Sequence, residues 1–332
     1  MVQRKCKEAK DLMDQVKPSI KEIYSEIMYH YHYNMGLLHF FHKDHVKAVE
    51  SYTAAYDAGF DDYPLYKFSL YFNLGLCYSH LGMYLRAIDC YLKADHLFRC
   101  ERGEFLRMHL DNNLALDYIK IGETELAKRR LKEVIHYAEV FKNNVISGRA
   151  MTNLGRACIK EKEYNRALDY FEVAKVFVNE GEEGHFGILY YKILCLIMMN
   201  NSQAESELAY ARSVLQGNDR HMMHFNSLSH LLTLDDNSSV DYIKNTSTPF
   251  LMENFAYHRI VDIYEIMENH FMVKGDRLKA LEIKSLSSDL YKIMMQGNKI
   301  VEKRALGLLL AIIMVASTSV TAFADPGDDD GF

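Results

Sequence analysis

The stretch at residues 72–98, FNLGLCYSHLGMYLRAIDCYLKADHLF, decides the fold, because its small and apolar residues recur at helical spacing. Gly75 is followed twelve residues later by Ala87, and then by Tyr91 and Ala94 at intervals of four and three. The same spacing occurs at 33–59, 112–138 and 152–177, so that four units follow one another at intervals of 39, 40 and 40 residues. The equivalent positions are Gly36, Ala48, Tyr52 and Ala55; Ala115, Ala127, Leu131 and Val134; and Gly155, Ala167, Phe171 and Ala174.

This repeat predicts helical hairpins, because two antiparallel helices approach closely only where Gly or Ala faces Ala, while larger apolar residues fill the gaps between neighbours. Only 4 prolines and no tryptophan in 332 residues agree with an all-α fold. We expect an N-terminal helix at 1–20 and a repeat domain at 21–299. Later units are weaker: Ala204, Leu208 and Ala211 predict a fifth unit, Ala280 lies in a last one, and 218–250 reads as a shortened helical pair with loops.

The four units resemble the tetratricopeptide repeat. Their length near 40 residues and their aromatic-rich first helices, YHYHYNMGLLHFF (29–41) and LYKFSLYFNLGLCYSHLG (65–82), resemble the Rap-type peptide-pheromone receptors of Gram-positive bacteria, within the group that includes the PlcR and NprR types. The resemblance spans about residues 20 to 296. It implies a right-handed superhelix whose concave groove binds a short signalling peptide and which regulates a partner such as a response regulator.

Members of that group that act as phosphatases carry an amino-terminal three-helix bundle, and those that act as transcription factors carry a helix-turn-helix. About twenty residues precede the first repeat in this sequence, so we expect neither output activity, no enzyme and no direct nucleic-acid binding. The net charge of −6, of which the four aspartates after residue 324 contribute −4, also leaves no basic excess for nucleic acid.

Candidate peptide-binding residues come from the first helix of each unit, which lines the concave face. Asparagine recurs at one position of four units (Asn34, Asn73, Asn113, Asn153), and Asn112 faces inward on the same count. A side-chain amide can donate to and accept from an extended peptide backbone. The alternative is that these asparagines serve packing between units.

Basic residues gather toward the middle of the same face. Arg149 and Arg156 lie two turns apart near His109, with Lys120 and Lys160 at the rim. Guanidinium groups there would bind carboxylates in bidentate fashion, although an ordinary solvated helix face is the alternative. The full set of predicted peptide-binding residues is Asn73, His109, Asn112, Asn113, Lys120, Arg149, Asn153 and Arg156.

The histidine cluster at 30–45 lacks cysteine or carboxylate partners at ligand spacing, so we predict packing and surface roles, no metal and no cofactor. The six cysteines are dispersed and predict reduced thiols in a cytoplasmic protein. No catalytic motif is present.

The stretch 301–332 has the layout of a secretory signal followed by an acidic peptide. Lys303 and Arg304 precede an apolar run, and Ala322 and Ala324 form an A-x-A cleavage site before Asp325. Cleavage would release DPGDDDGF, which looks like a pheromone from a pro-peptide joined in frame to its receptor and made separately from an internal start near Met294, Met295 or Val301. The alternatives are a frameshift or engineered fusion, or a membrane anchor at 305–324 on a scaffold for protein assembly.

Overall fold

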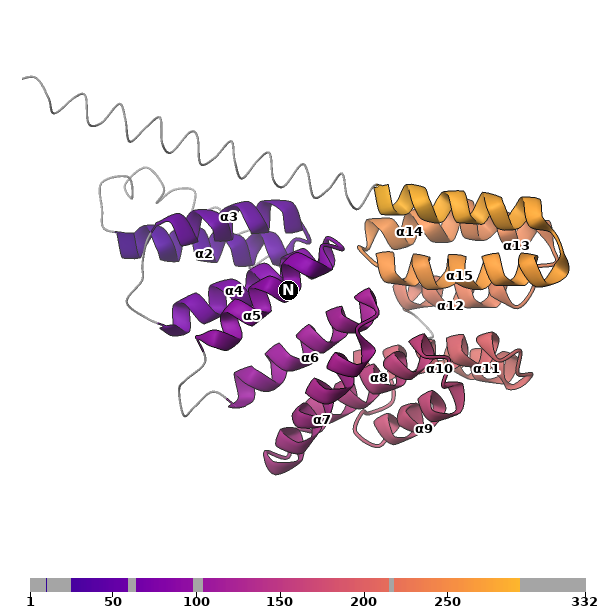
Figure 1. Cartoon of the computed structure of the whole chain (residues 1–332), viewed down its shortest axis with the longest axis horizontal. Helices are drawn as coiled ribbons and strands as arrows, with labels where there is room; N and C mark the ends of the chain where they lie inside the picture. The colour runs from indigo at the N-terminus through magenta and orange to yellow at the C-terminus, as the bar shows by residue number, and fades with distance from the viewer. Residues whose placement is uncertain (1–9, 11–24, 59–63, 98–103, 215–217, 293–332) are drawn as a thin grey trace, which may run out of the picture. The chain divides into compact units, whose positions relative to one another are not determined.

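A computed structural model describes residues 10, 25–58, 64–97, 104–214 and 218–292, which are almost entirely helical (Figure 1). They divide into two compact units, one that holds the described residues before 61 and one that spans 61–292. The first unit contains α2 (Ser25–Phe41) and α3 (His45–Asp57). The second contains α4 (Pro64–His80), α5 (Tyr84–His96), α6 (Glu104–Ile121), α7 (Thr124–Val140), α8 (Asn144–Lys160), α9 (Tyr164–Lys175), α10 (Glu183–Met198), α11 (Gln203–Val214), α12 (Asp219–Leu231), α13 (Asn237–Tyr242), the π-helical turn η1 (Ile243–Ser247), α14 (Thr248–Glu253), α15 (Tyr257–Lys274) and a last helix at 277–292.

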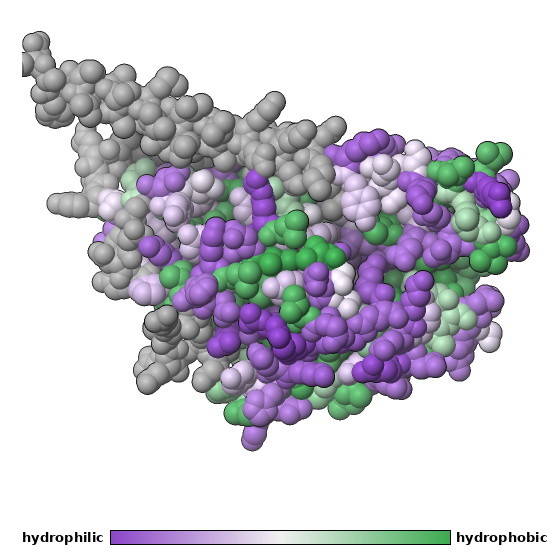
Figure 2. Space-filling model, in the orientation of Figure 1, coloured by the Kyte–Doolittle hydropathy of each residue, from purple (hydrophilic) through white to green (hydrophobic). Residues whose placement is uncertain are grey.

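The helices pack in hairpins, as the repeat predicts. In the first unit α2 pairs with α3, and in the second α4 pairs with α5, α6 with α7, α8 with α9 and α10 with α11. The first helices also contact one another in succession from α4 through α6, α8 and α10 to α12. Within the second unit the first helices thus form one layer and the second helices another, which is the tetratricopeptide-repeat arrangement. Hydrophilic residues dominate the visible face of α6 to α9 in Figure 2.

In three of the hairpins the close approach depends on glycine, but its partner differs from the prediction. A Cβ built on Gly75 would lie 2.4 Å from Cε1 of Tyr91, and one on Gly155 equally close to Cε1 of Phe171. Gly36 faces Tyr52 in the same way, at 2.5 Å. The glycine therefore meets an aromatic ring of the second helix rather than an alanine, because the ring lies flat against bare backbone and no side chain fits between them.

The turn between the two helices of a hairpin is also repeated. One residue there has a left-handed backbone: Lys43, Gly82, Gly122, Lys162 and Asn200, with φ between 51° and 90°. The next residue donates its amide to a carbonyl five positions back, as Glu163 does to Cys158 at 2.8 Å. This bond and the left-handed residue before it define a Schellman motif, which ends each first helix at the same point.

The segment 218–250 differs from the shortened pair with loops that the sequence predicts. It holds the 13-residue helix α12 and then a nearly continuous helix, α13–η1–α14, in which a π-turn occupies the stretch read as a loop. Pro249 has no amide hydrogen, and the hydroxyl of Thr248 donates to the carbonyl of Ile243 at 2.9 Å. This side-chain bond supports the helix where proline interrupts the backbone ladder.

The weaker later units are confirmed as helical and packed, since Ala204, Leu208, Ala211 and Ala280 are all buried. The cysteines of the described residues, Cys77, Cys90, Cys158 and Cys195, are buried free thiols. Burial, with the nearby Asp89 charge, raises the pKa of Cys90 to about 12.

None of the helices in the described part of the chain has both the length and the apolar composition needed to cross a membrane. The stretch 305–324 and the predicted cleavage site at Ala322, Ala324 and Asp325 lie outside the described residues.

Candidate functional site

A chain of polar contacts crosses the layer of first helices in the second unit. Asn153 of α8 is buried, and its amide donates to Oδ1 of Asn112 on α6 at 3.1 Å. Arg156, one turn further along α8, donates to Oδ1 of Asn153 at 3.3 Å. The guanidinium of Arg156 also lies 4.3 Å from the ring centroid of Tyr191 on α10. Three predicted residues are therefore linked in series: Asn112 to Asn153 between neighbouring repeats, and Asn153 to Arg156 within α8.

The helix α15 contributes further polar residues that the sequence analysis did not identify. His258 shares a hydrogen bond with the hydroxyl of Tyr191 at 3.1 Å. Lys160 of α8 pairs with Asp262 of α15 at 2.8 Å, and with Glu265 at 3.7 Å. Although burial disfavours its charge, Asp262 raises the pKa of Lys160 above its ordinary value. The polar face of α8 thus looks onto α15 within the second unit.

His258 is neutral at physiological pH. Burial, followed by the positive charges of Arg156, Lys120 and Arg259, holds the pKa of this imidazole well below its ordinary value. The cations of Arg156 and Arg259 near this imidazole would attract an anionic ligand, whereas Asp262 and Glu265 of the same helix are already paired with Lys160.

Lys120 is held in a buried cluster on α6 rather than at an open rim. Its Nζ donates to Asp117 at 2.8 Å and to the hydroxyl of Ser79 at 2.9 Å, and lies 4.6 Å from the ring centroid of Tyr84. Burial outweighs the attraction of Asp117, so that the pKa of Lys120 is lowered. Lys120 is 9% exposed, and Asp117 is fully buried. A peptide carboxylate would have to compete with Asp117 for this ammonium group.

The other predicted residues lie around this chain of contacts. Arg149 is exposed on α8, and its charge, after burial, lowers the pKa of the half-buried His109. Asn113 is half-buried and donates to the carbonyl of His109 within its own helix at 2.8 Å. Asn73 is half-buried on α4. Peptide contact by each of the eight residues stays a prediction.

The histidines of α2 and α3 belong to no group of three potential metal-ligating side chains among the described residues. Among the described residues, three potential metal-ligating groups lie together only at Cys158, Glu161 and Glu163. Glu161 there is already ion-paired with Lys128, and Cys158 is buried with a pKa raised by that burial. These pairings compete with any metal.

Comparison with known proteins supports the fold. A tetratricopeptide-repeat family model matches residues 68–97, and no curated protein sequence matches the chain. Among solved structures, the chain is similar to a Rap protein complexed with Competence and Sporulation Factor, at a TM-score of 0.72 and 14% identity over 87% of this chain and 81% of the other. It is also similar to aspartyl phosphate phosphatase F from Bacillus subtilis, at a TM-score of 0.68 and 15% identity over 80% of this chain and 71% of the other.

A third similar structure is NprR in complex with its cognate peptide NprX, at a TM-score of 0.65 and 18% identity over 88% of this chain and 84% of the other. The chain therefore has the tetratricopeptide fold of the Rap and NprR quorum-sensing receptors over most of its length, as the sequence resemblance predicts. At these identities the similarity concerns the fold.

Proposed function

We propose that this protein is an intracellular receptor that binds a short acidic signalling peptide on its layer of first helices and regulates a partner protein in quorum sensing. The observation that carries the proposal is the linked set of Asn112, Asn153 and Arg156, which joins two side-chain amides to a positive charge across neighbouring first helices. Its structural neighbours include a receptor bound to its cognate peptide, which supports the same use of the fold.

The peptide we propose is DPGDDDGF, residues 325–332. Its five carboxylates, four of aspartate and one at the C-terminus, complement the positive charge of Arg156 near His258, which burial and neighbouring cations keep neutral. Released from a separately made precursor, it would reach the receptor from outside the producing cell. A search of expressing cells for a shorter product that starts near residues 294–301 tests this origin, and its absence would contradict it.

Isothermal titration with synthetic DPGDDDGF tests the receptor itself. The full-length chain should carry serine in place of Asp325, Asp328, Asp329 and Asp330, so that its own tail does not compete with the peptide. We expect micromolar affinity or better, weakened by salt because the attraction is electrostatic. No binding at 100 µM peptide would refute the assignment.

Arg156→Gln is the decisive variant, because a hydrogen bond to a charged group contributes about 1.5–3 kcal/mol, or roughly 10- to 150-fold in affinity. Arg129→Gln removes the same charge from the exposed face of α7 and is the matched control. We expect Arg156→Gln to bind the peptide at least about tenfold more weakly and Arg129→Gln to bind it with unchanged affinity. Equal losses in both variants would indicate a nonspecific charge effect.

We further propose that the protein acts by binding and not by catalysis. The likeness to an aspartyl phosphate phosphatase makes the test direct: incubation with phosphorylated response regulators should leave the phosphoryl group in place. Faster loss of phosphate in the presence of the protein would contradict this part of the proposal.

A further inference from the structure

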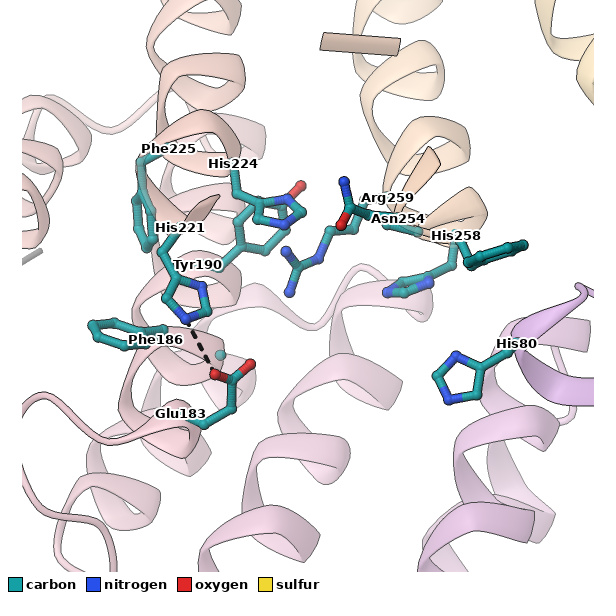
Figure 3. Close-up of a pocket in the computed structure, with 13 residues that line it drawn as sticks. His80, Glu183, Phe186, Tyr190, His221, His224, Phe225, Asn254, His258 and Arg259 are labelled. Carbon is teal, nitrogen blue, oxygen red and sulfur yellow. Dashed lines mark hydrogen bonds and ion pairs between the residues drawn. The ribbon is translucent and has the colours of Figure 1, made fainter. Parts of the chain in front are cut away.

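A cavity of about 200 Å³ lies where the first turns of α10, α12 and α15 converge (Figure 3). Its walls are partly aromatic, from Phe186 and Tyr190 on α10 and Phe225 on α12. Its polar lining includes the histidines of α12 together with His258 and Arg259 of α15. The lining residues thus come from the amino-terminal halves of α10, α12 and α15, from the segment 254–256 and from His80 of α4.

The residues that line this cavity include one arginine, Arg259, and one carboxylate, Glu183. Its guanidinium carbon lies 4.3 Å from the ring centroid of Tyr190, and Figure 3 shows the group reaching from α15 toward the histidines of α12. Its Nε is buried and has no hydrogen-bond acceptor among the residues that the structure describes. A buried donor without an acceptor costs about 1–3 kcal/mol, more for a charged group, which a ligand that accepts from it would recover.

Glu183, the acidic residue among those that line the cavity, is paired with His221. Glu183 stands at the rim with its side chain 86% exposed, and its carboxylate pairs with Nε2 of His221 at 3.1 Å. His221 in turn packs against the ring of Phe186 with ring centroids 4.2 Å apart. The interior thus keeps its positive charge and its aromatic walls.

We infer that this cavity binds a peptide carboxylate adjoining an aromatic ring, with Arg259 as its counter-ion and the rings of Phe186 and Phe225 as its walls. An apolar cavity of roughly 150 Å³ accommodates benzene, so about 200 Å³ is enough for a phenyl ring and the start of a carboxylate. The inference rests on the proposed peptide-receptor function. The free acid of DPGDDDGF presents such a group at its final phenylalanine.

The cavity is linked through His258 to the chain of contacts described above. His258 lines it and is hydrogen-bonded to Tyr191, over which Arg156 lies. A peptide that contacts Asn153 and Arg156 can therefore extend past Tyr191 and place its aromatic acid beside Arg259. This order fixes the direction in which the peptide runs.

The test is a double-mutant cycle between protein and peptide. The full-length chain with serine at its four tail aspartates and at Phe332 is titrated with three peptides: the free acid of DPGDDDGF, its C-terminal amide, and the free acid with alanine as its last residue. The protein is compared with Arg259→Met, with Arg129→Met as the exposed control and circular dichroism as a check on folding.

We expect the amide and Arg259→Met each to weaken binding about tenfold, and Arg259→Met to bind acid and amide equally. The peptide that ends in alanine should bind at least about tenfold more weakly, because it leaves the cavity unfilled. The inference would be overturned if the protein with Arg259 bound acid and amide equally, or if the difference in affinity between acid and amide persisted in Arg259→Met. Either result would leave the receptor assignment intact. Failure of every peptide to bind would instead refute the proposed function.

Discussion

The contact of Gly155 with the ring of Phe171 leads to a quantitative prediction. Gly155→Ala would place a methyl group 2.4 Å from Cε1 and 2.8 Å from Cζ of Phe171, whereas carbon atoms pack at about 3.5–4.0 Å. Phe171 is fully buried and cannot withdraw into solvent. The ring must therefore move against packed neighbours, or the two helices must separate.

The magnitude follows from two opposing effects. Overpacking of this kind costs about 1–3 kcal/mol, and the short contact favours the upper end. Replacing glycine by alanine inside a helix returns about 1 kcal/mol. We expect a net loss of about 2 kcal/mol, or about 4–8 °C in Tm for a unit of this size.

The third repeat suggests the rescue. It carries Ala115 where the others have glycine, and Leu131 where they have an aromatic residue, both fully buried. Phe171→Leu alone should cost about 1.5 kcal/mol through the space it leaves. The double variant Gly155→Ala/Phe171→Leu should cost about 1.5 kcal/mol in total, far less than the sum of the single variants, because the new methyl group occupies that space.

Urea unfolding followed by circular dichroism measures all four corners of this cycle. Gly187→Ala on α10 is the matched control, because a Cβ built there has no neighbour within 4 Å, and it should be neutral or stabilising by up to about 1 kcal/mol. A Gly155→Ala protein as stable as the parent, or costs that simply add in the double variant, would refute the packing argument.

Three further predictions concern buried polar groups. The pKa of His258 is depressed in the fold, so its contribution to the free energy of unfolding is complete above its unfolded pKa near 6.5 and is lost as pH falls below that value. Between pH 7.5 and pH 5.5, the free energy of unfolding of His258→Gln, measured with urea, should fall by about 1.4 kcal/mol less than that of the parent. Arg130 pairs with the buried Asp111 at 2.7 Å, so Arg130→Met should destabilise by about 3 kcal/mol, whereas Arg129→Met should change stability by less than about 0.5 kcal/mol in the same assay. With the two cysteines outside the described residues replaced by serine, a thiol reagent at pH 8 should react only on unfolding; rapid reaction of the folded chain would contradict the burial of Cys77, Cys90, Cys158 and Cys195.

The repeat was predictable because its signal is local: Gly75, Ala87, Tyr91 and Ala94 lie within one hairpin, and each spacing reports one helix face. The inward orientation of Asn112 followed from the same periodicity, whereas Asn153, predicted from the recurring asparagine position, is buried. Their bond to each other did not follow from the periodicity, because it joins residues 41 apart in the sequence. Only the stacking of neighbouring repeats brings them into contact.

The polar residues of α15 were not predicted, for a related reason. His258 and Arg259 lie where the repeat pattern has faded, after a proline that the Thr248 hydroxyl accommodates within a π-turn. Spacing alone predicts a break in the helix at that point, and without the helix there is no register from which to orient the residues that follow. The ion pair between Lys160 and Asp262 likewise joins residues that are 102 apart in the sequence.

The repeated turn at the end of each first helix offers a means of engineering the array. Two of its five equivalent positions hold lysine in a left-handed backbone, at Lys43 and Lys162, where other repeats hold glycine. A non-glycine residue in this conformation destabilises the fold by about 1 kcal/mol. Lys→Gly at each site should therefore raise Tm by a few degrees without altering the core or the groove. Natural variation at this one position could therefore set how readily each hairpin opens, repeat by repeat, while the surface that meets the ligand stays the same.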